Sequence, residues 1–161
     1  MMNSVLCYLE ETAKRLPDKI AFFDLECEIT FKELRERAID TAFFIQSMIS
    51  GRRNPILTYL PKTVESIVAF MGILYSGNFY TPTDIRFPKE KVKSIIHTLQ
   101  PAAILVNTKT KEKLSKMEGL ENIALINMDE IPCCQCYEEG ERLVSEILDV
   151  DPVYTFFTSG S

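Results

Sequence analysis

Residues 55–84 read PILTYLPKTVESIVAFMGILYSGNFYTPTD. An apolar run at 56–60 predicts a buried strand, and a turn at 61–63 leads into a helix whose apolar positions recur from Val64 to Leu74. Gly77 closes that helix, and a second short strand is predicted at 79–81. Short apolar strands joined by an amphipathic helix are typical of a parallel sheet that is covered on both faces.

The same alternation extends in both directions from this unit. Thr30 and Glu33 form a capping box at the start of a long helix, because each side chain can satisfy a free backbone N–H. The chain is therefore predicted to be α/β and three-layered, with a mainly parallel sheet and helices on both faces. The remaining predictions are helices at 4–16, 31–49, 89–99 and 109–117, and strands at 20–23, 28–30, 102–106 and 123–126.

The last third of the chain departs from this pattern. Pro132, three cysteines and Gly140 predict a loop over 129–140, followed by one or two helical turns at 141–148. A final strand is predicted at 153–157. A parallel strand normally leads into a crossover helix, and none follows. We therefore interpret 1–161 as a single, incomplete α/β domain that is truncated after this strand.

Composition excludes several classes of protein. The chain has 161 residues, of which 46% are hydrophobic, enough for one globular domain with a real core. The net charge of −5 argues against a nucleic-acid partner. No apolar run approaches the ~20 residues that cross a bilayer, so no membrane partner is expected. Five cysteines without a signal peptide fit a reducing cytoplasmic location.

The loop after the predicted last strand is the candidate binding site. It consists of Thr158, Ser159, Gly160 and Ser161, which together with the strand occupy 153–161. Small residues let the backbone approach a phosphate closely, and hydroxyls and backbone N–H groups donate hydrogen bonds to it. Composition alone leaves a plain flexible tail as the alternative.

Other chemistry-bearing residues are given structural roles. Zinc sites need four ligands, usually in two pairs, and Cys133, Cys134 and Cys136 have no second pair, so we predict loop thiols and no metal site. The remaining candidates are the following: Arg52 and Arg53 are predicted in a solvated turn, Asp84 in a turn, Tyr80 as a core or interface aromatic, and His97 on the surface.

Three segments in this order resemble the N-terminal part of the adenylate-forming enzymes. The segments are Thr30–Leu34 (TFKEL), Gly72–Asp84 (GILYSGNFYTPTD) and Phe157–Ser161 (FTSGS). They are similar to the family's T-Y-x-E-L helix start, its L-K-A-G-x-Y-V-P-x-D-P segment and the opening of its Y-T-S-G-S-T-G-x-P-K-G phosphate loop. The resemblance is strongest to amino-acid adenylation domains of nonribosomal peptide synthetases and to D-alanine–carrier-protein ligases.

The resemblance implies an enzyme that activates a carboxylate, an amino acid by preference, as acyl-AMP with ATP and Mg²⁺. The acyl group then passes to a thiol of a phosphopantetheine carrier protein or of CoA. Only Thr158, Ser159, Gly160 and Ser161 match the family's phosphate loop, and no catalytic residue of the family falls within this chain. We therefore expect a fragment that is inactive alone, holds no cofactor tightly, and self-associates or requires its missing remainder.

Two alternatives to an adenylating fragment remain open. The chain could be a non-catalytic interaction module, or half of a split protein that a partner chain completes. It could also be a flavodoxin-like binder of a phosphorylated ligand.

Overall fold

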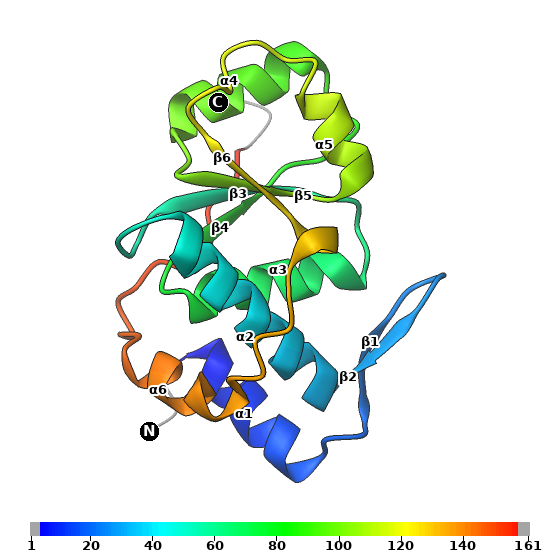
Figure 1. Cartoon of the computed structure of the whole chain (residues 1–161), viewed down its shortest axis with the longest axis vertical. Coiled ribbons are helices and arrows are strands. Elements are labelled where there is room, and N and C mark those ends of the chain that lie inside the picture. The colour runs from blue at the N-terminus through cyan, green and yellow to red at the C-terminus, as the bar shows by residue number, and fades with distance from the viewer. Residues whose placement is uncertain (1–3, 158–161) are drawn as a thin grey trace.

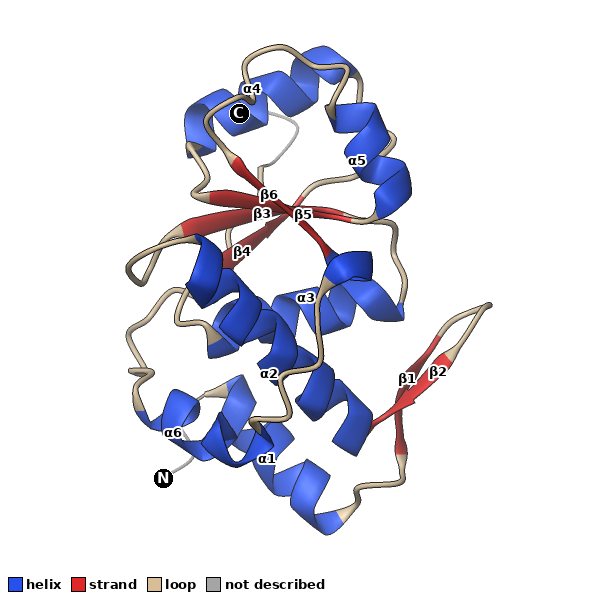
Figure 2. Cartoon of the chain, viewed as in Figure 1, coloured by secondary structure: helices blue, strands red, loops and turns tan. Residues whose placement is uncertain are grey.

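The computed structural model describes residues 4–157 and places four parallel strands at its centre, in the order β4-β3-β5-β6 (Figures 1 and 2). The strands of this sheet are β3 (Pro55–Tyr59), β4 (Phe79–Pro82), β5 (Ala103–Val106) and β6 (Ala124–Asn127). The helices are α1 (Val5–Arg15), α2 (Phe31–Met48), α3 (Val64–Tyr75), α4 (Lys89–Leu99), α5 (Thr108–Leu114) and α6 (Gly140–Ser145). The predicted α/β class is confirmed.

Alternating residues of each strand divide between two cores, which is why both faces of the sheet carry helices. In β5, Ala103 and Leu105 join the core beneath α2 and α3, whereas Ile104 and Val106 join the core beneath α4 and α5. Figure 1 shows the two pairs of helices on opposite sides of the sheet. This arrangement confirms the predicted three layers, because period-2 alternation of apolar residues on both faces leaves neither face for water.

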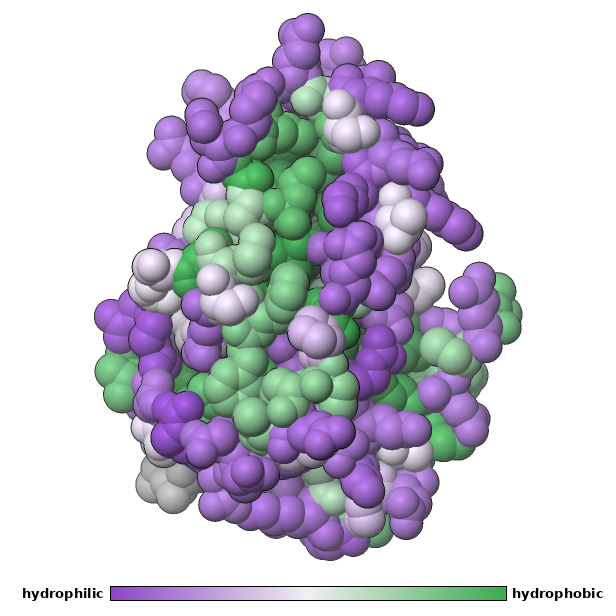
Figure 3. All heavy atoms as spheres, in the orientation of Figure 1, coloured by the Kyte–Doolittle hydropathy of each residue, from purple (hydrophilic) through white to green (hydrophobic). Residues whose placement is uncertain are grey.

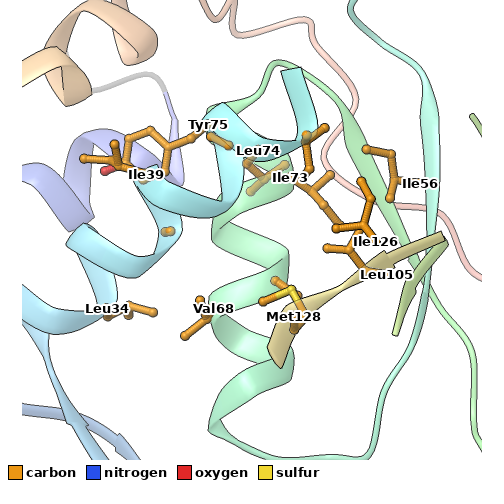
Figure 4. Packing of buried hydrophobic residues seen from close by; sticks show 14 of the residues in the cluster. Leu34, Ile39, Ile56, Val68, Ile73, Leu74, Tyr75, Leu105, Ile126 and Met128 are labelled. Carbon is orange, nitrogen blue, oxygen red and sulfur yellow. The ribbon is translucent and has the colours of Figure 1, made fainter. Parts of the chain in front are cut away.

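The larger core lies between the sheet and the α2–α3 pair. Figure 4 shows Ile56, Leu105 and Ile126 from three strands directed toward Ile73 of α3. Gly72 allows α3 to approach α2 closely, since a Cβ there would lie 2.5 Å from the side chain of Thr41. A small residue at this crossing therefore sets the distance between the two helices.

A further pair of helices, α1 and α6, packs beneath α2 and α3, and a buried charge joins them. The Glu10 carboxylate accepts hydrogen bonds from Tyr75 Oη at 2.7 Å and from Arg35 Nε at 2.9 Å. Arg35 also donates to the backbone oxygen of Tyr137 at 2.7 Å. Buried charges of this kind destabilise a fold by several kcal/mol if one partner is removed. The network therefore fixes the chain that precedes α6 to α1, α2 and α3.

A two-stranded antiparallel hairpin, β1 (Ile20–Phe23) and β2 (Glu28–Thr30), projects from the body of the molecule (Figure 2). Its turn is tied back at one point, because the Asp24 carboxylate accepts the N–H of Val64 at 2.7 Å. The N-cap residue Thr63 makes no side-chain cap, so Asp24 caps α3 from a distance of forty residues in the chain. Hydrogen bonds from the backbone N–H groups of Val64, Glu26 and Cys27 hold the pKa of Asp24 below its usual value.

The structure confirms the capping box at Thr30 and Glu33 and differs from the sequence predictions near the C-terminus. Residues 153–157 make only a single parallel bridge, between Tyr154 and Tyr80, instead of a full strand. The predicted loop 129–140 contains two short 3₁₀ turns, η1 (Met128–Glu130) and η2 (Tyr137–Glu139). Across residues 4–157, each helix is too short or too polar to cross a bilayer.

Candidate functional site

A cavity of about 530 Å³ opens at the carboxyl ends of β3 and β4. In open parallel sheets ligands bind beyond these ends of the strands. Residues that follow the two strands supply its polar groups, and aromatic side chains supply much of its apolar wall. The lining residues are Thr58, Leu60, Pro61, Lys62, Ser66, Phe70, Pro82, Thr83, Asp84, Ile85, Arg86, Phe87, Phe156 and Phe157.

Thr83 carries an unusual buried polar group in the cavity wall. Its side chain is 4% exposed, and its Oγ1 has no hydrogen-bond partner among the described residues. Its backbone N–H is satisfied by the oxygen of Thr58 at 2.9 Å, which aligns the loop with β3. An unpaired buried hydroxyl costs about 1–3 kcal/mol, so such a group in a cavity wall points to a partner from outside the described chain.

Three charged residues lie at the cavity mouth: Asp84 and Arg86 pair with each other, and Lys62 is left to interact with an anionic ligand. Arg86 donates to both carboxylate oxygens of Asp84 and also through its backbone N–H, which holds the pKa of Asp84 well below its usual range. Asp84 is thus an ionised turn residue, as predicted, and not a base. Lys62 is exposed at the same mouth, and no ion pair involving it is found within residues 4–157. This leaves its ammonium group to meet an anion.

A row of aromatic rings leads from α3 to the segment that precedes the predicted phosphate loop. Phe70 stacks on Tyr80 with ring centroids 4.3 Å apart, Tyr80 meets Tyr154 at 5.9 Å, and Tyr154 meets Phe156 at 5.0 Å. Tyr80 is half-buried between these rings, which agrees with the predicted core or interface aromatic, and burial raises the pKa of its hydroxyl. The last ring of this row, Phe156, lines the cavity together with the next residue, Phe157.

The predicted binding residues Thr158, Ser159, Gly160 and Ser161 lie outside the described residues. The structure does place the chain that leads to them. Tyr80 N–H donates to the oxygen of Val153 at 3.2 Å, and Thr155 N–H donates to the oxygen of Tyr80 at 3.0 Å. Two hydrogen bonds thus attach this segment to the edge of β4, next to the cavity.

The other candidates named from the sequence lie apart from the cavity. His97 is exposed on α4, as predicted. Arg52 and Arg53 are also exposed, and they pair with Glu146 and Asp151. The sequence pattern did not indicate these two partners, because they lie more than ninety residues away. The arginine pair therefore fastens the chain after α6 to the start of β3.

The three clustered cysteines lie in the loop between η1 and η2, and the backbone N–H of Cys134 donates to Asp40 of α2. Cys133 is exposed, and Cys134 and Cys136 are half-buried. Within the part of the chain that the structure describes, no three His, Cys, Asp or Glu side chains form a group that could hold a metal ion.

Sequence patterns did not single out Lys62 and Thr83 as site residues. The sequence places Lys62 in the predicted turn at 61–63, and it places Thr83 only within the longer segment Gly72–Asp84. A signal was nevertheless present, since both residues directly follow neighbouring parallel strands, and such positions meet at one edge of a sheet. The pairing of β3 with β4 was needed to bring them together.

Comparisons with known proteins place this architecture in a family. The family model "AMP-binding enzyme" matches residues 9–161. The polyketide synthase PksN of Bacillus subtilis (strain 168) is 27% identical over 94% of this chain and 3% of its own length. D-alanine–D-alanyl carrier protein ligases of Streptococcus equi subsp. equi (strain 4047) and Staphylococcus aureus (strain JH9) are 25% and 29% identical, over 30% of their lengths.

Solved structures show the same fold over a similarly small share of larger proteins. The four-domain nonribosomal peptide synthetase AB3403, in its holo form bound to AMP and glycine, superposes with a TM-score of 0.80 and 18% identity, over 97% of this chain and 11% of that one. A fatty acyl-adenylate ligase from L. pneumophila, in complex with acyl adenylate and pyrophosphate, gives 0.73 and 20%, over 88% and 25%. The chain spans less than a third of the length of each of these relatives. Because the family model matches nearly all of its residues, the chain belongs to the AMP-binding enzyme family.

Proposed function

We propose that this chain is part of an adenylate-forming ligase that activates an amino acid or another carboxylate as acyl-AMP and transfers the acyl group to a carrier-protein or CoA thiol. The observation that carries the proposal is the cavity at the carboxyl ends of β3 and β4, within the segment that the AMP-binding family matches. Phe156 and Phe157 line this cavity directly before the four candidate phosphate-binding residues.

The part of the reaction assigned to this chain is binding. A carboxylate and the α-phosphate of ATP repel each other, so donors and cations must offset their charge in the transition state. The hydroxyls of Thr158, Ser159 and Ser161 would donate hydrogen bonds to the phosphates. Gly160 would let the backbone approach the phosphates closely. Lys62 and Thr83 would supply a cation and a hydroxyl at the cavity. Mg²⁺, when bound with ATP, offsets phosphate charge; we assign it no ligand in this chain.

Carboxylate-dependent exchange of pyrophosphate into ATP tests the proposal, in the natural full-length protein that contains this chain. We expect exchange with at least one amino acid of a panel, and about a tenfold loss in Ser159→Ala, since one charge-assisted hydrogen bond contributes roughly that much. Ser145→Ala is the matched control, because its hydroxyl donates to the backbone oxygen of Arg142 within α6, away from the cavity. Exchange without any carboxylate, or no exchange with any member, contradicts the proposal.

An interaction module completed by a partner chain is the second candidate, and the exposed apolar surface favours it. Phe22, Phe23 and Leu25 of the hairpin are exposed, Phe23 by 80%, and Phe156 is exposed beside the cavity. Figure 3 shows hydrophobic residues spread over the middle of the visible face, between hydrophilic ends. Such surfaces favour association. Light scattering that shows a monomer at high concentration, with no ATP binding restored by the remainder of the protein, would exclude this candidate.

The acceptor and the cellular location are part of the same proposal. The curated relatives include two D-alanine–D-alanyl carrier protein ligases, which supports a carrier protein as the acceptor. Four cysteines, Cys27, Cys133, Cys134 and Cys136, are free thiols, which supports a reducing cytoplasm.

A further inference from the structure

The segment 132–137 packs against α2 and carries three thiols within four residues. We propose that Cys134 and Cys136 form a reversible disulfide, and that this modification loosens the contact between the segment and Asp40 of α2. The site is separate from the proposed nucleotide cavity, and the inference does not depend on the proposed function.

Both thiols lie within one tight turn of the backbone. Gln135 lies between them in a left-handed conformation, with φ of 56°, which folds the chain into a tight turn. The N–H of Cys136 donates to the sulfur of Cys134 at 3.4 Å. The thiol of Cys136 donates to the backbone oxygen of Cys134 at 3.3 Å. Each sulfur therefore contacts the backbone of the other residue.

Cys133 belongs to a different contact. Its sulfur lies 2.8 Å from the hydroxyl of Tyr137, and its side chain is exposed. The structure thus separates the three thiols into a pair, Cys134 and Cys136, and a single residue, Cys133. Cys133 serves as the built-in control for the pair.

The buried carboxylate of Asp40 connects the pair to α2. Its Oδ1 accepts the backbone N–H of Cys134 at 2.8 Å, and its Oδ2 accepts the hydroxyl of Tyr137 at 3.5 Å. The thiol of Cys134 also hydrogen-bonds to this carboxylate. Burial and this hydrogen bond raise the pKa of the Cys134 thiol to about 12. Cys134 is therefore held as a thiol, and we assign the first attack on an oxidant to the other member of the pair, Cys136.

The oxidation balances with hydrogen peroxide as the oxidant. The Cys136 thiolate attacks one peroxide oxygen, the S–O bond forms, the O–O bond breaks, and the departing hydroxide takes a proton to give water. The sulfur of Cys134 then attacks the sulfenic sulfur of Cys136, the S–S bond forms, the S–O bond breaks, and the Cys134 proton leaves with hydroxide as a second water. Two thiols lose two electrons, and one peroxide gains them.

Disulfide formation removes two hydrogen-bond donors at once. The thiol of Cys136 no longer donates to the oxygen of Cys134, and the thiol of Cys134 no longer donates to Asp40. The carboxylate of Asp40 is 8% exposed, so water compensates it poorly. The segment should then open more often, with amide hydrogen exchange over 132–139 rising roughly fivefold, as expected for the loss of one hydrogen bond.

Peptide mapping after peroxide treatment tests the assignment directly. Trypsin releases residues 117–142 as one peptide, which contains all three of these cysteines and neither of the other two in the chain. Under non-reducing conditions the expected product lacks two hydrogens and carries one alkylatable thiol, on Cys133. Dithiothreitol should restore three alkylatable thiols and the original rate of amide exchange.

Serine variants identify the pair. Cys133→Ser should keep the disulfide, whereas Cys134→Ser and Cys136→Ser should each lose it and show no rise in exchange over 132–139 on oxidation. A disulfide that persists in Cys134→Ser or Cys136→Ser, or sulfinic and sulfonic acids as the only products in the wild type, would overturn the proposal. A disulfide without any change in exchange would overturn the proposed loosening of the Asp40 contact.

Discussion

The carboxyl ends of the four parallel strands differ sharply from one side of the sheet to the other. At the β5–β6 side every polar side chain that we name has a partner: Asn127, 3% exposed, donates to Thr108 Oγ1 and Glu130 Oε1, and accepts from the N–H of Asp129. At the β3–β4 side Thr83 Oγ1 has no partner among the described residues, and a cavity lies open beside it.

The two pairs of loops at the carboxyl ends of the strands therefore have different roles: one pair stabilises the fold, and the other is suited to binding a ligand. The polar network after β5 and β6 connects two loops by side-chain hydrogen bonds, so it contributes to the free energy of unfolding. The loops after β3 and β4 leave the buried hydroxyl of Thr83 without a partner among the described residues, at a cost in stability, and they leave Lys62 exposed to solvent. Sites that bind ligands commonly keep such groups unpaired until a ligand arrives.

The largest effect is expected at the closed side. Asn127→Ala should lower the free energy of unfolding by about 2–3 kcal/mol, because it removes three part-buried hydrogen bonds at once, with Thr108 Oγ1, Glu130 Oε1 and the N–H of Asp129. Urea denaturation followed by circular dichroism measures the loss. Asn54→Ala is a useful control, since within residues 4–157 its half-buried side chain makes one hydrogen bond, to the oxygen of Ser50. A loss below about 0.5 kcal/mol for Asn127→Ala would contradict the role of the network.

A matched pair of threonines sharpens the comparison. Thr110 at the closed side is 2% exposed, and its hydroxyl accepts the N–H of Asn107 at 3.0 Å. Thr83 is 4% exposed, and its hydroxyl has no partner within residues 4–157. Thr110→Val should destabilise the fold by about 1–2 kcal/mol, and Thr83→Val should leave it unchanged or more stable. Equal losses of stability in thermal unfolding would show that the hydroxyl of Thr83 is satisfied after all.

The same residue should behave oppositely in ligand binding. If the cavity takes part in nucleotide binding, Thr83→Val should raise the Kd for ATP about fivefold in the full-length protein, because one neutral hydrogen bond is lost. Thr81→Val provides the control, since its hydroxyl is also buried without a partner in the described part of the chain, but Thr81 does not line the cavity. Calorimetric titration that finds equal Kd values for Thr83→Val and the wild type would remove Thr83 from the site.

The smallest effect concerns pH. Hydrogen bonds from Thr108 lower the pKa of Asp129. Its contribution to stability is therefore complete above the unfolded value near 3.8, and it is lost as pH falls through the lower folded pKa. Asp129→Asn should flatten the acid limb of the stability curve measured between pH 5 and about 2. We expect Asp84→Asn to change it less, because Asp84 and Arg86 are two residues apart and their contact can also form in the unfolded chain. The reverse order would contradict this account.

Local sequence signals predicted most of the elements correctly. The capping box at Thr30 and Glu33 and the apolar spacing of the helices needed only neighbours within a few residues, so the sequence could reveal them. The predicted strand 153–157 was reduced to a bridge at Tyr154. Its apolar run predicted burial, but Val153, Tyr154 and Phe156 remain exposed at the edge of β4.

The candidate site also has a part that the sequence could indicate and a part that it could not. The hydroxyl-rich residues 158–161 could be named because their composition is itself the signal, and their role stays a prediction. The cavity, the unpaired hydroxyl of Thr83 and the contact between Asp40 and Cys134 depend on residues far apart in the chain. Periodicity carries no information on such contacts, since it reports only which side of an element is apolar.

The sequence by itself determined the α/β class, the alternation of strands with amphipathic helices and the family resemblance, because these follow from local patterns of apolar residues and turn residues. The tertiary structure alone decided which carboxyl ends of the strands are closed by hydrogen bonds and which are left open. The physical reason is that a buried polar atom gains or lacks a partner only when strands and loops distant in the chain are packed together.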